Sequence, residues 1–426
     1  MMRNLGTFAA LSSVALLGLA ACGQQEPAAA PLAPPPPATE APALPPVAEL
    51  KKEEPKPVPL TAEQKTKLYQ EGWSAFNAKD FAKFSSIWAD GATSEALDMG
   101  PPLVGAAAIV DSGAKAWATA FPDGSGEIQL TLVNGNNIQG VVLMRGTQTG
   151  TMVTPMGAVP ATGKKVGFLA AHAIELNDAG KVVKEVMAYD GGTVAGQLGL
   201  MPMPHRKAMD AGWSDKPVVI ATGNEVEKSN LAAMAKEVEA FNKHDAAGSL
   251  ASAADDIVFS ELSAPADRVG KKESLKGMED MFKAFPDVKL DIKSSWAAGD
   301  YVVSTGTWSG TNTGDSPAMK LKKTGKSVSV HFVEIDKIVS GKTKNIWLFS
   351  NGAAAAAQLG LMPPKAAEPK GPTGKETKPV ASKAPADKAA PAMKPVEAKP
   401  AAAAAPAKPA AATPAPAMKP AATPTK

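Results

Sequence analysis

The chain has 426 residues and a formal net charge of +3. This length is too great for one ordinary hydrophobic core, so two domains with tails are expected. The segment from residue 364 onward holds eleven Lys and four acidic residues, a balance of +7, which leaves −4 for the rest of the chain. Because that rest contains no basic helix with interleaved aromatic residues, nucleic acid is excluded as an expected partner.

The N-terminus has the pattern of an exported protein. Arg3 precedes an apolar stretch over residues 5–21, which is shorter than a membrane span. The stretch ends in Leu-Ala-Ala-Cys at 19–22 and resembles the lipobox of bacterial lipoproteins, with an ordinary signal peptide and a chance cysteine as the alternative. The resemblance implies removal of residues 1–21 and acylation of Cys22, with palmitate among the expected modifications.

Acylation at Cys22 would anchor the protein in the lipid bilayer of the bacterial cell envelope. Gly23 stands where inner-membrane retention would call for Asp, so the outer membrane is favoured. Cys22 is the only cysteine, and therefore no disulfide is expected within the domains.

Two segments are expected to be disordered because they offer little to bury. Residues 22–60 form a Pro-rich linker, with twelve prolines between residues 23 and 60. Residues 364–426 consist almost entirely of Ala, Pro, Lys and Thr. We interpret this tail as a solvated spacer, with contact to anionic cell-wall polymer as the alternative.

Four motifs occur twice in the same order, which indicates a duplicated domain. They are Phe-Asn-x-x-Asp at 76–80 and 241–245, Ala-Phe-Pro-Asp at 120–123 and 284–287, Gly-Thr-x-x-Gly-Thr at 146–151 and 306–311, and Gln-Leu-Gly-Leu-Met-Pro at 197–202 and 358–363. We place the first domain at 61–204 and the second at 218–363, with residues 205–217 as the joint.

The elements follow the same order in both copies. Apolar residues at helical spacing predict a first helix over 62–78 and 225–243, and a second over 106–120 and 272–284 is ended by Phe-Pro-Asp. Strands separated by turn signals are then predicted at 127–133, 140–151, 165–176 and 181–189, and at 289–297, 301–311, 327–338 and 343–349. Helices followed by strands predict an α+β fold, in which a curved antiparallel sheet and its helices form a cone open at one end.

These motifs, together with Thr-Gly-Lys at 162–164 and 324–326, resemble the SnoaL-like polyketide cyclase (ester cyclase) family of the nuclear transport factor 2-like superfamily. The resemblance covers nearly all of both copies. It implies two tandem cone-shaped, cystatin-like domains. It also implies cofactor-free chemistry, in which an Asp at the end of a late strand is the general acid/base of an intramolecular aldol ring closure.

The residue matching that Asp is Asp190. A carboxyl group in an apolar cone has its charged form disfavoured, which suits acid/base work. The alternative is an Asp that accepts hydrogen bonds from the following turn. The resemblance further implies His172 as a catalytic companion and Arg145 as a ligand-binding residue, with an exposed strand histidine and a surface ion pair as the respective alternatives.

Strand alternation extends this hypothesis to the neighbouring residues. If Asp190 faces the cone interior, then Val186 and Ala188 share that face and line the ligand site. The same spacing in the second copy gives Trp347, Phe349 and Asn351, and an amide does no acid/base work. We therefore predict that the first copy keeps the site and that the second has lost it.

Two functions remain open at this stage. The first is a membrane-anchored, cofactor-independent cyclase, lyase or isomerase acting on a small apolar carbonyl compound. The second is a non-catalytic envelope lipoprotein that binds a small hydrophobic ligand or a protein partner. No two histidines and a carboxylate have metal-ligand spacing, so no metal site is predicted.

Overall fold

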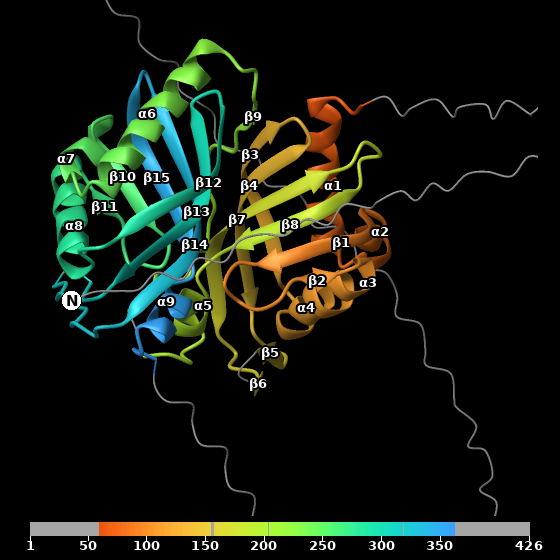
Figure 1. The fold of residues 1–426 in the computed structure, drawn as a ribbon. Helices are drawn as coiled ribbons and strands as arrows, with labels where there is room; N and C mark the ends of the chain where they lie inside the picture. Colours follow the sequence, from red (N-terminus) through yellow and green to blue (C-terminus); the bar gives the residue numbers. More distant parts are fainter. Residues whose placement is uncertain (1–58, 155–156, 203, 318, 363–426) are drawn as a thin grey trace, which may run out of the picture. The chain divides into compact units, whose positions relative to one another are not determined.

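A computed structural model describes residues 59–362 apart from 155–156, 203 and 318 (Figure 1). The predicted lipidation site Cys22, nearly all of the Pro-rich linker and the tail lie outside the described residues. The described part falls into one compact unit that holds both copies of the repeat. None of its helices combines the length and the apolar character needed to cross a membrane.

The first helix of each copy starts with a capping box. In the first copy, Thr61 accepts a hydrogen bond from the backbone N–H of Gln64, whose side chain accepts one from the Thr61 N–H. Asn224 and Glu227 make the same pair of bonds in the second copy. The helices of the first copy are α1 (Ala62–Ala78), α2 (Phe81–Ser86), α3 (Ala106–Ala108), the π-helix η1 (Ile109–Lys115), α4 (Ala116–Ala120) and α5 (Gly191–Gln197). Those of the second copy are α6 (Glu225–Asn242), α7 (Ala246–Ser249), α8 (Lys271–Ala284) and α9 (Gly352–Gln358).

Each copy also contributes one main sheet. The strands of the first sheet lie in the order β2 (Leu103–Val104), β1 (Trp88–Ala96), β8 (Val182–Ala188), β7 (Lys165–Leu176), β4 (Asn137–Thr147), β3 (Ser125–Asn134) and β9 (Val218–Ile220). The second sheet has the order β11 (Arg268–Val269), β10 (Ala253–Glu261), β15 (Lys342–Ser350), β14 (Ser327–Val339), β13 (Tyr301–Thr311) and β12 (Lys289–Ala298). A small hairpin, β5 (Met152–Thr154) with β6 (Gly157–Val159), stands apart from both.

The two tandem α+β domains are confirmed, but the sheets are mixed and not antiparallel as expected. The strand β1 pairs in parallel with β8, and β10 pairs in parallel with β15. Both parallel strands were missed in the sequence because they carry polar residues and a register irregularity instead of a regular alternation. In addition, β9 pairs in parallel with β3, so residues 218–220 extend the first sheet.

One motif of the repeat was aligned in the wrong register. The backbone N–H of Thr147 donates to the Asp123 side chain. In the second copy, the backbone N–H of Thr311 donates in the same way to Asp287. The Gly-Thr segment at 146–150 therefore corresponds to 310–314 and not to 306–310. Gly and Thr recur every four residues in this segment of the second copy, so the sequence allows either alignment. The hydrogen bond to the Asp of the Phe-Pro-Asp turn distinguishes between them.

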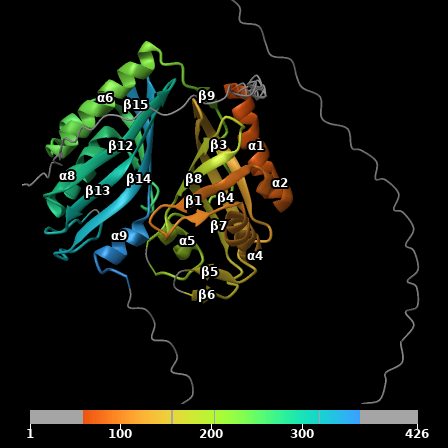
Figure 2. The ribbon, with the colours of Figure 1, turned by 45° about the vertical axis from the view of Figure 1, so that its right-hand side comes forward.

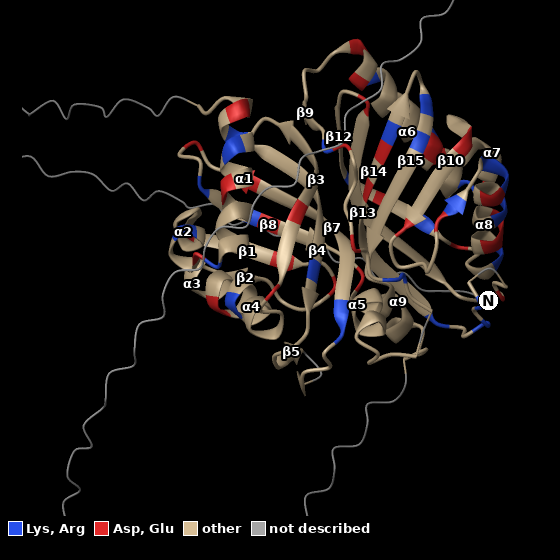
Figure 3. Ribbon diagram, turned by 180° about the vertical axis from the view of Figure 1, so that it is seen from behind, with Lys and Arg blue, Asp and Glu red and all other residues tan. Residues whose placement is uncertain are grey.

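The two sheets pack against each other through one shared apolar cluster, while α1, α6 and α8 lie on their outer faces (Figures 1 and 2). We call this the interdomain cluster. Its buried members are Leu130, Leu132, Val141, Leu143, Leu169, Ala171 and Ala188 from the first domain, with Leu262, Ala298, Tyr301, Val303, Val333, Ile335 and Phe349 from the second. Charged residues of both signs gather instead on helices such as α1, α6 and α8 (Figure 3).

We expect Phe349→Ala to lower the free energy of unfolding by about 3–5 kcal/mol, the usual loss for a buried Phe. Phe349 has no exposed surface and lies in the interdomain cluster. Urea denaturation measures the change, with Val269→Ala, at a side chain that is 63% exposed in the same domain, as the control. Equal losses in the two variants would contradict a stabilising role for this cluster.

Candidate functional site

The first domain encloses a cavity of about 580 Å³ between its helices and its sheet. Most of the wall is apolar and much of it is aromatic. These lining residues include Trp73, Phe76, Phe84, Trp88, Met99, Trp117, Met144, Met152, Met187 and Tyr189. A mainly apolar space of this size suits a small organic molecule, provided that a few polar groups orient it.

A chain of four polar side chains lies in the wall of this cavity. The Tyr69 hydroxyl is 2.9 Å from Nδ1 of His172, and Nε2 of His172 is 2.7 Å from a carboxylate oxygen of Glu185. The second carboxylate oxygen of Glu185 accepts a hydrogen bond from the Ser94 hydroxyl. We call Tyr69, His172 and Glu185 the polar triad. All three residues, and Ser94, line the cavity.

Helical and strand periodicity place the triad. Tyr69, Trp73 and Phe76 follow one another at the spacing of one face of α1, and all three are buried. Glu185 and Met187 on β8, and Tyr189 directly after it, point into the cavity because alternate residues of an extended chain share a face. Gly140 on β4 makes room for the tyrosine, since a Cβ there would lie 2.0 Å from the Tyr69 hydroxyl oxygen.

The surroundings set the charge of the two ends of the triad. Burial acts to raise the pKa of Glu185, but the hydrogen bonds from His172 and Ser94 leave that pKa below its ordinary value. Glu185 is therefore ionised at neutral pH. Burial raises the pKa of Tyr69 well above its ordinary value, so its hydroxyl stays protonated. This combination allows Nε2 of His172 to donate to Glu185 and Nδ1 to accept from Tyr69.

Asp190 lies outside this cavity. It precedes α5 as the N-cap residue, and its carboxylate accepts hydrogen bonds from the backbone N–H groups of Gly192 and Thr193. A third bond comes from the N–H of Gly352 in the second domain, at 2.9 Å. The structure thus gives Asp190 the alternative role of a turn acceptor, and a catalytic role rests on the resemblance alone.

The predicted orientation of Val186 and Ala188 is wrong. Ala188 packs in the interdomain cluster together with Phe349 and Trp347, on the side of the sheet opposite the cavity. Val186 alternates with Glu185 and Met187 and so shares the face of Ala188. The error came from assuming that Asp190 faces the interior. Asp190 instead lies with Ala188 on the side of the second domain, where it accepts the N–H of Gly352.

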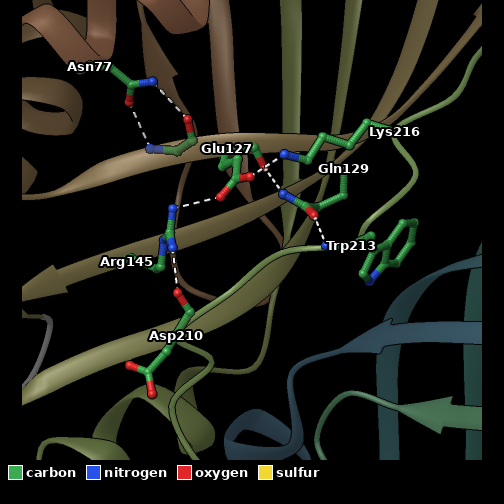
Figure 4. A network of polar contacts seen from close by, with 8 residues as sticks. Asn77, Glu127, Gln129, Arg145, Asp210, Trp213 and Lys216 are labelled. Atoms are coloured by element: carbon green, nitrogen blue, oxygen red, sulfur yellow. Dashed lines mark hydrogen bonds and ion pairs between the residues drawn. The ribbon is translucent and has the colours of Figure 1, made fainter. Parts of the chain in front are cut away.

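Arg145 does not line the cavity either. It belongs to a polar network between the first sheet and the joint (Figure 4). Its guanidinium forms an ion pair with Glu127 at 2.6 Å and donates to the backbone carbonyl of Asp210 in the joint. Lys216 pairs with the same Glu127, and Gln129 accepts the N–H of Trp213. Arg145 therefore holds the joint against the first sheet, which agrees with the alternative of a surface ion pair.

Tyr69 and Glu185 were missed in the sequence. Two signals were available: Tyr69 lies in the helical series with Trp73 and Phe76, and Glu185 alternates with Met187 and Tyr189 on β8. What the sequence does not contain is the pairing between β7 and β8, which brings His172 beside Glu185. Among the residues described, no cluster of three or more His, Cys, Asp or Glu side chains could hold a metal ion.

The second domain has a different interior. In the first domain, His172 pairs with Met187 of the neighbouring strand. The equivalent pair in the second domain is Glu334 with Leu348, so Glu334 occupies the position of His172. By the same register, Ile346 stands in place of Glu185. The polar triad is therefore absent from the second domain, where the described residues at these two positions cannot form it.

The second interior instead collects three carboxyl groups, from Glu237, Glu334 and Asp336. Burial raises the pKa of Glu334 to about 7, and the charge of Glu237 adds to this effect. Burial and the two neighbouring acids hold the pKa of Asp336 well above its ordinary value. Asp336 has no exposed surface, and neither carboxyl oxygen has a partner among the described residues.

The fold is an α+β domain of helices packed on a curved mixed sheet, and it is present twice in one chain. The model of the SnoaL-like polyketide cyclase family matches residues 65–198 and again residues 232–359. Because these matches cover more than half of the sequence, the chain belongs to this family. The resemblance inferred from the motifs is thereby confirmed.

Several solved structures are similar to single domains of this chain. AclR from Streptomyces galilaeus is 31% identical over 32% of this chain and 88% of its own, with a TM-score of 0.29. TsrD from Streptomyces laurentii is 21% identical over 32% and 97%, with a TM-score of 0.29. An LEH-like epoxide hydrolase from M. tuberculosis is 13% identical over 32% and 91%, with a TM-score of 0.27. A comparison with curated proteins gives no match.

The buried acids of the second domain predict that stability falls as the pH rises. The pKa of such a carboxyl group is higher in the folded state than in the unfolded state, where it is about 4. The group therefore stabilises the fold fully below pH ~4, and this contribution is lost as the pH rises through the folded-state pKa. For Glu334 the window runs from about 4 to about 7. We expect Asp336→Asn to raise the melting temperature at pH 8 by at least about 3 °C and to change it less at pH 5.

Thermal unfolding followed by circular dichroism at both pH values measures this difference. Asp291→Asn is the matched control, because the Asp291 side chain is 67% exposed. A shift for Asp336→Asn that is the same at both pH values would contradict the assignment of a raised pKa.

Proposed function

We propose that the first domain binds a small apolar carbonyl compound and catalyses proton transfer on it without a cofactor, as in a cyclase or isomerase. The observation that carries the proposal is the polar triad, a connected set of ionisable groups in the wall of an otherwise apolar cavity. Membership of the SnoaL-like polyketide cyclase family supports the same class of chemistry.

The triad supplies the proton acceptor that such a reaction needs. A base must remove a proton from the carbon next to the carbonyl group. In the proposed step the substrate C–H proton passes to the Tyr69 oxygen while the Tyr69 hydroxyl proton passes to Nδ1 of His172. The imidazolium formed is balanced by the ionised Glu185, and the reverse transfers return the proton to the product.

Non-catalytic binding of an apolar ligand is the second candidate. The observation that favours it is that every hydrogen-bonding position of His172 is already occupied by Tyr69 and Glu185. A network satisfied in this way also serves to hold α1 against β7 and β8. The two candidates differ in whether the triad exchanges a proton with a bound carbonyl compound.

The protein is further proposed to act at the cell envelope, anchored through acylated Cys22. The lipobox-like segment at 19–22 supports this proposal. An apolar ligand with low solubility in water would be found at such a surface. Contact of the Lys-rich tail with cell-wall polymer is a separate proposal that rests on its charge alone.

Deuterium exchange tests the catalytic proposal. We expect the protein to speed the incorporation of deuterium next to the carbonyl group of β-tetralone, an apolar ketone, in deuterated water. Tyr69→Phe and Glu185→Gln should each lower that rate by about 100-fold or more, because each removes one member of the proton relay. Mass spectrometry of the recovered ketone measures the rate.

The Asp190→Asn variant separates the two assignments of the catalytic group. Its single amide oxygen still accepts one of the N–H groups of Gly192 and Thr193 and keeps the cap of α5, so we expect exchange close to that of the unaltered protein. Loss of exchange in Asp190→Asn together with normal exchange in Tyr69→Phe would overturn the proposed role of the triad. Binding of the ketone without any exchange would favour the non-catalytic candidate.

Cell fractionation tests the anchor. We expect the full chain to sediment with the membranes and Cys22→Ser to be released or retained as an unprocessed precursor, because serine cannot accept the thioether-linked lipid. Sedimentation of a processed Cys22→Ser protein with the membranes would show that another part of the chain provides the attachment.

A further inference from the structure

The loop of residues 97–102 joins β1 to β2 and forms part of the rim of the cavity. Three of its residues, Met99, Gly100 and Pro101, line the cavity, as does Leu103 at the start of β2. Within its own domain the loop is held by two backbone bonds, from the N–H of Leu97 to the carbonyl of Met187 and from the N–H of Met99 to the carbonyl of Ala96. The bonds made by Asp98 come from the second domain.

Asp98, at the centre of the loop, is fastened by the second domain. One carboxylate oxygen accepts the backbone N–H of His331 at 2.9 Å, and the other lies 2.8 Å from Nδ1 of the same histidine. The side-chain amide of Asn351 donates to the backbone carbonyl of Asp98 at 3.1 Å. The Asp98 side chain is only 15% exposed, although that of His331 is 56% exposed.

The backbone of Asp98 shows that this arrangement is a defined conformation. Its φ angle is +56°, in the left-handed region that few residues other than Gly, Asn and Asp adopt readily. Its neighbour Met99 lines the cavity and also packs against the start of α5. The terminal methyl group of Met99 would lie 3.2 Å from a Cβ at Gly191. That position is also 3.6 Å from the side-chain oxygen of Asn351.

The corresponding loop of the second domain is held differently. The backbone N–H of Leu262 donates to Leu348 as that of Leu97 does to Met187, which places Ser263 at the position of Asp98. The Ser263 hydroxyl donates to Glu261 of its own domain, and Arg206 of the joint pairs with Asp267. The two fastenings are thus not copies of each other, and the one formed by Asp98 is at the rim of the cavity.

We propose that Asp98, His331 and Asn351 are positioning residues, through which the second domain fixes the rim of the cavity in the first domain and controls how fast an apolar ligand enters and leaves. This inference rests on the proposed use of the cavity as a ligand site. It gives the second domain, which lacks the polar triad, a role in the function of the first.

The variants that test the proposal all lie in the second domain, away from the cavity wall. His331→Ala removes the side-chain bond to Asp98. Asn351→Asp removes the donor to the Asp98 carbonyl, while its carboxylate still accepts the N–H of Ala354 and so keeps the cap of α9. His331→Asn is the rescue variant, because an Asn side-chain nitrogen is as far from the backbone as Nδ1 of histidine. Lys344→Ala, which breaks an exposed ion pair with Asp256, is the control.

Two measurements on the purified protein decide the outcome. Stopped-flow fluorescence gives the release rate of anilinonaphthalene sulfonate, used as an apolar probe, and hydrogen exchange gives the protection of residues 97–103. In the double variant His331→Ala/Asn351→Asp we expect both the release rate of the probe and the exchange rate of this segment to rise about tenfold, since two hydrogen bonds of typical strength are lost. In the single variants His331→Asn and Lys344→Ala, both rates should remain near those of the unaltered protein.

Unchanged probe release and unchanged exchange of residues 97–103 in the double variant would overturn the proposal. If the unaltered protein takes up no probe in its cavity, the proposed ligand site fails instead. Hydrogen exchange then still shows whether the second domain holds the loop, so the two failures are distinguishable.

Discussion

The packing of one sheet against the other fixes the direction of every functional side chain in this protein. Leu169, Ala171 and Ala188 are committed to the interdomain cluster, where they meet Val333, Ile335 and Phe349. Because side chains alternate along a strand, the residues between them must point to the opposite face. That face is the cavity, and it receives His172 from β7 and Glu185 from β8. The apolar contact between the domains therefore sets the geometry of the polar triad, although no triad residue takes part in it.

The two domains use the same backbone for different interiors. The register of the strands is preserved, yet His172 is replaced by Glu334 and Glu185 by Ile346. In the first domain the carboxylate is paired and its pKa is lowered, which leaves a charged group ready to compensate an imidazolium. In the second domain the carboxyl groups face each other in a buried space and their pKa values are raised. Such groups are a cost to folding at neutral pH and provide no proton relay.

The sequence was sufficient for the two longer helical segments of each copy, for four strands of each sheet and for the duplication, because these depend on local periodicity and on repeated motifs. It did not show the parallel strands β1 and β10, whose residues have no regular alternation. His172 was found through the family resemblance, but its partners Tyr69 and Glu185 come from α1 and β8 and are joined to it only by tertiary packing. The sequence left the role of Asp190 open for a related reason. The sequence around an Asp at the end of a strand does not distinguish a side chain that faces the interior of the cone from one that caps the next helix, as Asp190 does.

The central claim is that His172 is a functioning link between an ionised Glu185 and a protonated Tyr69. Nitrogen NMR of the protein with labelled histidine tests this directly, since the chain has only four histidines. The account predicts that the neutral ring of His172 carries its proton on Nε2 and that its nitrogen signals change when β-tetralone is added, while those of His244 do not. A neutral ring protonated on Nδ1, or His172 signals that are unaffected by saturating ketone, would contradict it.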